Sequence, residues 1–181
     1  MIFCRLDLYF FPILDIYTPI DRTILGYKEL FSPIRRFSMK KAAVIHDLSG
    51  FGKCSLTAAI PVLSALGVQC CPVATAVLTG QTGYPCYHCT DLTAMLPDYI
   101  DAWGKNNAHF DAIYSGFLTG AEQISQVLDF IHHFRKEHTL LLVDPVMGDD
   151  GNAYPFFTPG LLNGMKELTL EADVITPNRT E

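Results

Sequence analysis

From Ala42 onward, short apolar runs alternate with segments in which apolar residues recur at helical spacing. The apolar runs predict strands at 42–46, 68–78, 111–114, 139–143 and 172–175. The segments between them predict helices at 55–66, 91–103, 121–136 and 159–170. Strands and helices that alternate at these lengths are typical of βαβ units. We therefore expect an α/β domain whose central, mainly parallel sheet is flanked by helices on both faces.

The first predicted helix has residues at both ends that favour its boundaries. Ser55 is the expected N-cap, because a serine hydroxyl accepts a hydrogen bond from a free amide of the first turn. Gly67 is the expected stop, because glycine tolerates the left-handed backbone that ends many helices. Pro61 lies inside the segment and argues mildly against a helix, since proline removes one helical hydrogen bond.

The loops that follow the predicted strands are rich in glycine and in polar or acidic residues. Ligands of parallel sheets bind beyond the carboxyl ends of the strands, so these loops are the expected site. They are 46–53, 79–84, 115–117, 144–151 and 176–181. One such loop is ordinary turn chemistry, but several at one edge of a sheet predict a binding site.

Two familiar phosphate-binding motifs fail when they are compared with the loop after the first strand. Gly52-Lys53 resembles the end of a P-loop, but Asp47 stands where its first glycine belongs and Cys54 replaces Ser or Thr. Gly50-Phe51-Gly52 resembles a dinucleotide fingerprint, but Ser55 stands at its third glycine. Neither motif is present.

Composition and charge exclude some classes of protein without selecting a function. The 181 residues are 49% hydrophobic and 18% charged, which indicates one globular domain rather than a disordered chain. The formal net charge of −6 argues against a nucleic-acid partner, because phosphate backbones select basic surfaces.

Cysteines stand at positions 4, 54, 70, 71, 86 and 89. We expect them to be reduced thiols, and Cys86 and Cys89 lack a second Cys/His pair at zinc-finger spacing.

Residues 1–38 differ from the rest of the chain. They are aromatic and apolar but are interrupted by acidic residues and prolines, so they contain neither a membrane-spanning run nor a signal peptide. Met39-Lys40-Lys41, directly before the first apolar run, resembles a natural start. We interpret 1–38 as a poorly structured extension, and a targeting or docking segment stays open as the alternative.

The order of the loop motifs resembles the pyridoxal kinase branch of the ribokinase-like superfamily, and the resemblance covers residues 40–181. The motifs that carry it are Asp47, Gly50-Phe51-Gly52, Thr79-Gly80-Gln81-Thr82-Gly83-Tyr84, Ser115-Gly116-Phe117, Asp144-Pro145-Val146-Met147-Gly148-Asp149 and Thr176-Pro177-Asn178-x-x-Glu181. The resemblance implies a three-layer ribokinase-like fold, of which 39–181 form the N-terminal two-thirds, incomplete at the C-terminus. It also implies a cytoplasmic kinase of a vitamin B6 vitamer that has no membrane partner. A homodimer is compatible with the resemblance.

The resemblance also implies roles for single residues. Asp47 takes the place of a polar side chain that bonds the substrate ring, Thr82 belongs to the loop over the ring, and Tyr84 shapes that loop. The nucleotide and its cation fall to a second group of residues, which are Asp144, Asp149, Asn178 and Glu181. The implied cofactors are ATP and Mg²⁺, and a monovalent cation is compatible with the resemblance. Dispersed carboxylates fit this assignment, because Mg²⁺ keeps several waters and takes few protein ligands.

The same resemblance implies a catalytic aspartate in a Gly-x-Gly-Asp motif, and this motif does not occur in the 181 residues. A general base contributes roughly two to four orders of magnitude in rate. We therefore expect this chain by itself to be a weak kinase or none. Two other readings stay open, namely a hydroxymethylpyrimidine (phosphate) kinase of thiamine synthesis and a non-catalytic fragment that binds B6 vitamers.

Overall fold

The computed structural model describes residues 39–181, and the prediction for 1–38 lies outside this part. Six strands form one sheet, β1 Lys41–Ser49, β2 Gln69–Leu78, β3 Cys89–Asp91, β4 Ala112–Ser115, β5 Leu140–Val143 and β8 Val174–Ile175. The helices are α1 Ser55–Ala65, the 3-10 turn η1 Thr93–Met95, α2 Leu96–Lys105, α3 Ala121–Phe134 and α4 Pro159–Leu170.

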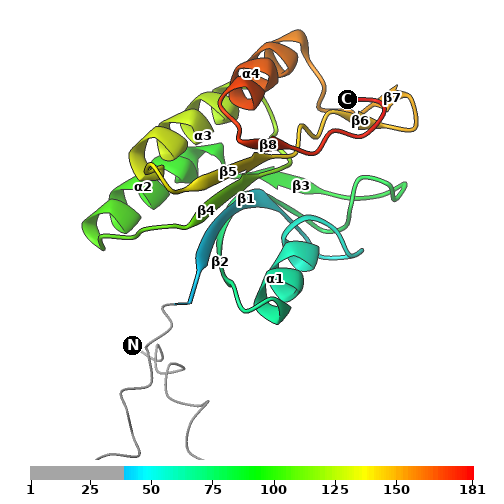
Figure 1. The fold of residues 1–181 in the computed structure, drawn as a ribbon. Helices are drawn as coiled ribbons and strands as arrows, with labels where there is room; N and C mark the ends of the chain where they lie inside the picture. The colour runs from blue at the N-terminus through cyan, green and yellow to red at the C-terminus, as the bar shows by residue number, and fades with distance from the viewer. Residues whose placement is uncertain (1–38) are drawn as a thin grey trace, which may run out of the picture. The chain divides into compact units, whose positions relative to one another are not determined.

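The sheet has the order β3-β2-β1-β4-β5-β8, and every pairing is parallel except that of β2 with β3. Helix α1 lies on one face of the sheet, and α2, α3 and α4 lie on the other (Figure 1). The expected α/β fold, a mainly parallel sheet between two layers of helices, is confirmed.

The central strand β1 is buried on both faces. Ala42 and Val44 pack toward α1 with Leu56, whereas Ala43 and Ile45 join the core on the other face. Successive side chains of a strand point to opposite faces, so an almost wholly apolar run is what a strand between two helix layers requires.

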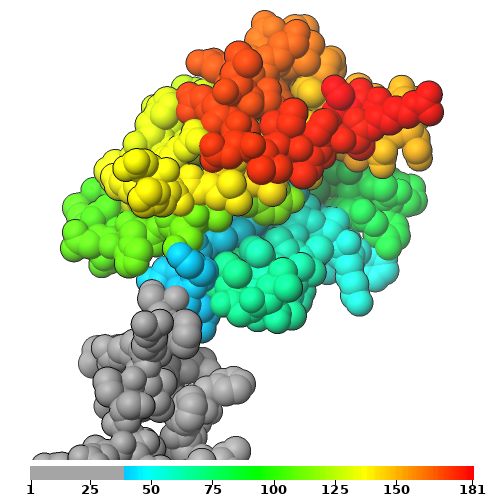
Figure 2. Space-filling view, in the orientation of Figure 1, coloured from blue at the N-terminus to red at the C-terminus, as the bar shows by residue number. Residues whose placement is uncertain are grey.

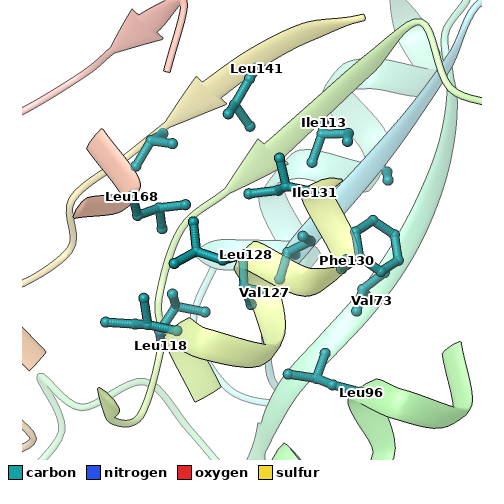
Figure 3. Close-up of a cluster of buried hydrophobic side chains, with 14 of the residues drawn as sticks. Val73, Leu96, Ile113, Leu118, Val127, Leu128, Phe130, Ile131, Leu141 and Leu168 are labelled. Atoms are coloured by element: carbon teal, nitrogen blue, oxygen red, sulfur yellow. The ribbon is translucent and has the colours of Figure 1, made fainter. Parts of the chain in front are cut away.

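The larger core lies between the sheet and α2, α3 and α4. Helix α3 brings Val127, Phe130 and Ile131, each fully buried, onto Ile113 and Leu141 of the sheet (Figure 3). Aromatic rings close the end of this core: Trp103, Phe110, Phe130 and Phe134 have neighbouring centroids 4.6–6.4 Å apart. Close-packed rings of this kind contribute beyond their buried area.

The first strand is longer than the sequence predicts. β1 continues through Ser49, because Ser49 pairs with Leu78 after a register shift between His46 and Leu48. The amide of Gly50 then donates to the carbonyl of Leu78 at 2.8 Å. His46 and Asp47 therefore lie on the strand itself, where the sheet holds them, rather than in the following loop.

One predicted helix start and one predicted N-cap are wrong. The helix predicted at 91–103 begins at Leu96, because Cys89–Asp91 pairs with β2 and the Asp91 carboxylate accepts the amide of Thr93 at 2.7 Å. Helix α1 has Cys54 rather than Ser55 at its N-cap, and Ser55 has a left-handed backbone with φ of 51°. The expected stop is confirmed, since Gly67 has φ of 74° directly after α1.

A short hairpin follows β5 and was not predicted from the sequence. Its strands are β6 Gly148–Asp149 and β7 Asn152–Ala153, joined by Asp150 and Gly151 with φ of 49° and 79°. Asp-Gly favours a two-residue turn in which both residues have positive φ.

Within 39–181, no helix has the length and apolarity that a bilayer crossing needs. The five cysteines of this part, Cys54, Cys70, Cys71, Cys86 and Cys89, are free thiols, as expected.

Replacing Phe130 by alanine should destabilise the domain by about 3–5 kcal/mol, because the change leaves a cavity in the aromatic end of the core. Phe157→Ala is the matched control, since Phe157 is 39% exposed and should change stability by less than about 1 kcal/mol. Urea unfolding followed by circular dichroism measures both. Equal effects of the two variants would contradict this assignment of the core.

Candidate active site at the carboxyl ends of the strands

The strand order reverses at β1, which has β2 on one side and β4 on the other. In open parallel sheets, ligands bind in the crevice at such a switch point. A cavity of about 370 Å³ lies there, and we call it the switch-point cavity. It is lined by His46, Asp47, Ser49, Cys54, Ser55, Leu78, Gln81, Thr82, Phe117, Asp144, Val146, Tyr154, Thr176, Asn178 and Glu181.

Asp47 is a buried carboxylate that lines the cavity, with 4% of its surface exposed. One carboxylate oxygen lies 3.0 Å from Nδ1 of His46, and the other accepts the hydroxyl of Ser49 at 2.7 Å. Burial by itself raises the pKa of Asp47, but hydrogen bonds from His46, Ser55 and Ser49 outweigh burial and leave the pKa below its ordinary value. Asp47 therefore offers the cavity a negative charge.

The loops after β1 and β2 are joined to each other. Besides the Gly50 bond, the amide of Gln81 donates to the carbonyl of Phe51 at 2.9 Å. Gly52 has φ of 99°, and a Cβ there would lie 2.9 Å from the side chain of Gln81, so this close approach requires glycine. Thr82 is among the residues that line the cavity, and its contact with a substrate ring stays a prediction.

Tyr84 is not among the residues that line the cavity. Its ring packs against that of Phe51 with centroids 4.9 Å apart, and 37% of its surface is exposed. The structure therefore places the ring of Tyr84 against Phe51 of the preceding loop, and both its role in shaping the loop and its contact with a substrate stay predictions.

The acidic side of the cavity comes from the loops after β5 and β8. The two oxygens of Glu181 accept the amides of Met147 and Asn178, each at 3.0 Å. The side chain of Asn178 donates to the carbonyl of Gly148 at 2.8 Å. The last residues of the chain thus lie along the β6–β7 hairpin, red beside orange in Figure 2. Glu181 and Asn178 hold two distant loops together.

Asp144 lies half-buried between these groups. Burial and the nearby charge of Glu181 raise the pKa of Asp144, while His46 and a hydrogen bond from Thr176 oppose the shift. A carboxylate that is buried beside another carboxylate favours a proton or a cation as a neighbour. The charge pattern fits a cation-binding side of the cavity.

The structure does not bring Asp149 to the cavity. Asp149 is exposed on β6, and its carboxylate accepts the amide of Asp150 at 2.9 Å. Its proposed contact with a nucleotide stays a prediction that this arrangement does not support.

Sequence reasoning gave no role to several residues that line the cavity, notably Tyr154 and Val146. Tyr154 follows the unpredicted hairpin, so no strand-end rule pointed to it. Phe117 stood in a quoted motif but received no role, although its buried ring packs against Phe156 with centroids 5.4 Å apart.

The donors at the acidic side fit Mg²⁺ rather than zinc. Among residues 39–181, no three His, Cys, Asp or Glu side chains converge as a ready-made metal cage. Mg²⁺ is bound through one or two carboxylates and keeps its remaining waters or substrate phosphates. Asp144 and Glu181 are oxygen donors of this kind, so they are the residues that would hold the ion.

The comparisons agree with this fold. The phosphomethylpyrimidine kinase family matches residues 52–181. The pyridoxine/pyridoxal/pyridoxamine kinase of Bordetella avium is 34% identical over 139 residues, which is 72% of this chain and 46% of that protein. A putative phosphomethylpyrimidine kinase from Bacteroides thetaiotaomicron has a TM-score of 0.77 at 47% identity, over 82% of this chain and 51% of that one.

A second crystal structure of the Bacteroides protein contains pyridoxal. That structure is 48% identical to this chain in sequence and covers 79% of this chain. Pyridoxal kinase from Lactobacillus plantarum has a TM-score of 0.73 at 33% identity, over 80% of this chain and 51% of that one. The chain belongs to the phosphomethylpyrimidine kinase family, and its fold is the ribokinase-like fold of the pyridoxal kinases. It spans about half the length of the Bordetella relative and of these solved structures.

Asp144→Asn should stabilise the metal-free protein at pH 7. A carboxyl whose pKa is raised by folding disfavours the fold wherever it is ionised, so asparagine removes a cost at neutral pH. The gain in melting temperature should shrink as the pH falls through the raised pKa of the folded protein, and it should vanish below about 4, where the carboxyl is protonated in both states. Thermal unfolding in EDTA across pH 3–8 measures it.

Asp129→Asn is the control, because Asp129 is an exposed residue of α3. A lower melting temperature for Asp144→Asn at pH 7 would mean that the charge of Asp144 is stabilised in the fold.

Proposed function

We propose that this chain carries the substrate and nucleotide sites of an ATP-dependent vitamin B6 kinase. The reaction is phosphorylation of the 5′-hydroxymethyl group of pyridoxal, pyridoxamine or pyridoxine. The observation that carries the proposal is the switch-point cavity, which has an anionic, hydrogen-bonded Asp47 on one side and Asp144 with Glu181 on the other. The bound pyridoxal in the 48%-identical Bacteroides structure supports it.

The two sides of the cavity suit the two substrates. Asp47 and Thr82 present a carboxylate and a hydroxyl to the polar groups of a heteroaromatic ring, and the ring of Phe117 provides an apolar wall. Asp144 and Glu181 would hold Mg²⁺, which neutralises charge on the phosphates of ATP when it is bound. Phosphoryl transfer depends mainly on positioning and charge neutralisation, so a cavity that holds both substrates in line meets its main requirement.

The general base is not assigned to any residue of the cavity. The family resemblance places it in a Gly-x-Gly-Asp motif that these 181 residues lack. Binding and turnover are therefore tested separately. The expected homodimer and cytoplasmic location, and a monovalent cation, stay proposals from the same resemblance.

Hydroxymethylpyrimidine (phosphate) kinase is the second candidate, because the matched family carries that substrate class in its description. Pyridine and pyrimidine substrates share a hydroxymethyl group on a flat ring. Titration of the chain with pyridoxal, pyridoxine and hydroxymethylpyrimidine separates the two. Tighter binding of the pyrimidine than of every B6 vitamer would favour the second candidate.

Asp47→Asn should weaken pyridoxal binding roughly tenfold or more, since hydrogen bonds to a charged group contribute about 1.5–3 kcal/mol. Binding of Mg²⁺-ATP should be unchanged, because Asp47 lies on the ring side of the cavity. Isothermal titration calorimetry with each ligand measures the two affinities, and Asp129→Asn serves again as the control. Unchanged pyridoxal affinity would remove Asp47 from the substrate site.

The 181-residue chain should show little or no turnover, at least about a hundredfold below a full-length relative, because the expected base contributes that much or more. A coupled assay of ADP release with pyridoxal, ATP and Mg²⁺ measures the rate. Metal-dependent turnover at the relative's rate would mean that a residue of this chain serves as the base.

A further inference from the structure

His46 is a buried histidine of the switch-point cavity to which neither the sequence motifs nor the proposed reaction assigns a role. It stands on β1 beside Asp47, and only 8% of its side chain is exposed. A buried imidazole in a binding cavity needs a physical reason, because polar rings are costly to bury unless their nitrogens are bonded.

One ring nitrogen of His46 has three close neighbours. Nδ1 lies 3.0 Å from a carboxylate oxygen of Asp47, and the amide N–H groups of Asp47 and Phe117 point at it from 3.1 and 3.3 Å. A bare Nδ1 could accept from these two amides, but it would share one lone pair between them and would face the carboxylate oxygen with no hydrogen in between. A hydrogen on Nδ1 makes that shortest contact a charge-assisted bond, which is about twice as strong as a neutral one.

The ring cannot turn away from this arrangement. Gly116 lies against it so closely that a Cβ at that position would be 2.2 Å from the imidazole. The ring of Tyr114 meets it edge-on, with centroids 6.0 Å apart. The imidazole is therefore held in one orientation by β4 and the segment that follows it.

His46 also spans the point where the strand order reverses. It belongs to β1, whereas Gly116 and Phe117 follow β4 on the other side of the crevice. The carbonyl of Phe117 accepts the hydroxyl of Thr75 at 2.9 Å, so the peptide of this cavity wall is held from β2 as well. A change in the His46 ring thus reaches both the carboxylate of Asp47 and the wall formed by Phe117.

We propose that His46 is a positioning residue of the substrate site, whose Nδ1–H holds the carboxylate of Asp47 in the orientation that meets the substrate ring. It acts through Asp47 and does not touch the reacting atoms. The inference rests on the proposed function, because Asp47 is taken to be the group that recognises the B6 vitamer.

The test uses the full 181-residue chain with His46→Ala, His46→Asn and the wild-type protein. Calorimetry with pyridoxal should show an affinity about tenfold lower for His46→Ala, and the affinity for Mg²⁺-ATP should change less than that for pyridoxal. His46→Asn should recover part of the loss, because its amide can still donate to Asp47. His132→Ala is the matched control, since His132 pairs with Glu171 on the surface of α3 and should leave both affinities unchanged.

A second measurement does not depend on ligand binding. Nitrogen-15 spectra of the histidine rings should show a hydrogen on Nδ1 of His46, and its signal should shift in Asp47→Asn. A bare Nδ1 overturns the inference, even if the alanine variant fails to fold. Equal pyridoxal affinity of wild type and a folded His46→Ala overturns it too. If the wild type binds neither vitamer nor pyrimidine, the proposed function fails, while the spectra still decide the bond between His46 and Asp47.

Discussion

The parallel pairing of β1 with β2 on one side and β4 on the other is the constraint on which the rest of the molecule depends. It buries β1 on both faces and opens the crevice at the point where the strand order reverses. The register shift between His46 and Leu48 lets the strand continue to Ser49. The functional side chains at its end are therefore held by the sheet rather than by a loop, which favours accurate positioning.

The cavity separates two kinds of electrostatic environment. At the end of β1, hydrogen bonds keep the pKa of Asp47 below its ordinary value despite burial. At the acidic side of the cavity, burial and the charge of Glu181 raise the pKa of Asp144, so its ionised form is less favourable than in the unfolded chain. A bound cation would stabilise the ionised form of Asp144. The arrangement of carboxylates that disfavours the metal-free fold therefore also favours the binding of a cation. Stability given up at a functional site in this way is common in enzymes.

Most elements could be predicted from the sequence because their periodicity is strong. Helix α4 has the predicted bounds, and the five predicted strands exist. The predicted boundaries were wrong where a contact between residues far apart in the sequence decided where an element begins or ends. The edge strand β3 formed because β2 offered a free partner, and the hairpin after β5 needed only a two-residue turn. Neither leaves a periodic signal, since each spans two or three residues per strand.

The sequence by itself determined the α/β alternation, the strand-end position of Asp47 and Asp144, and the resemblance that joined them. Only the tertiary structure decided that Asp149 is exposed on β6 outside the lining of the cavity, that Glu181 accepts the amides of two separate loops, and that His46 is buried beside Asp47. The physical reason is that periodicity reports which side chains are buried, whereas hydrogen-bond partners come from segments up to 71 residues apart that meet only after the sheet has formed.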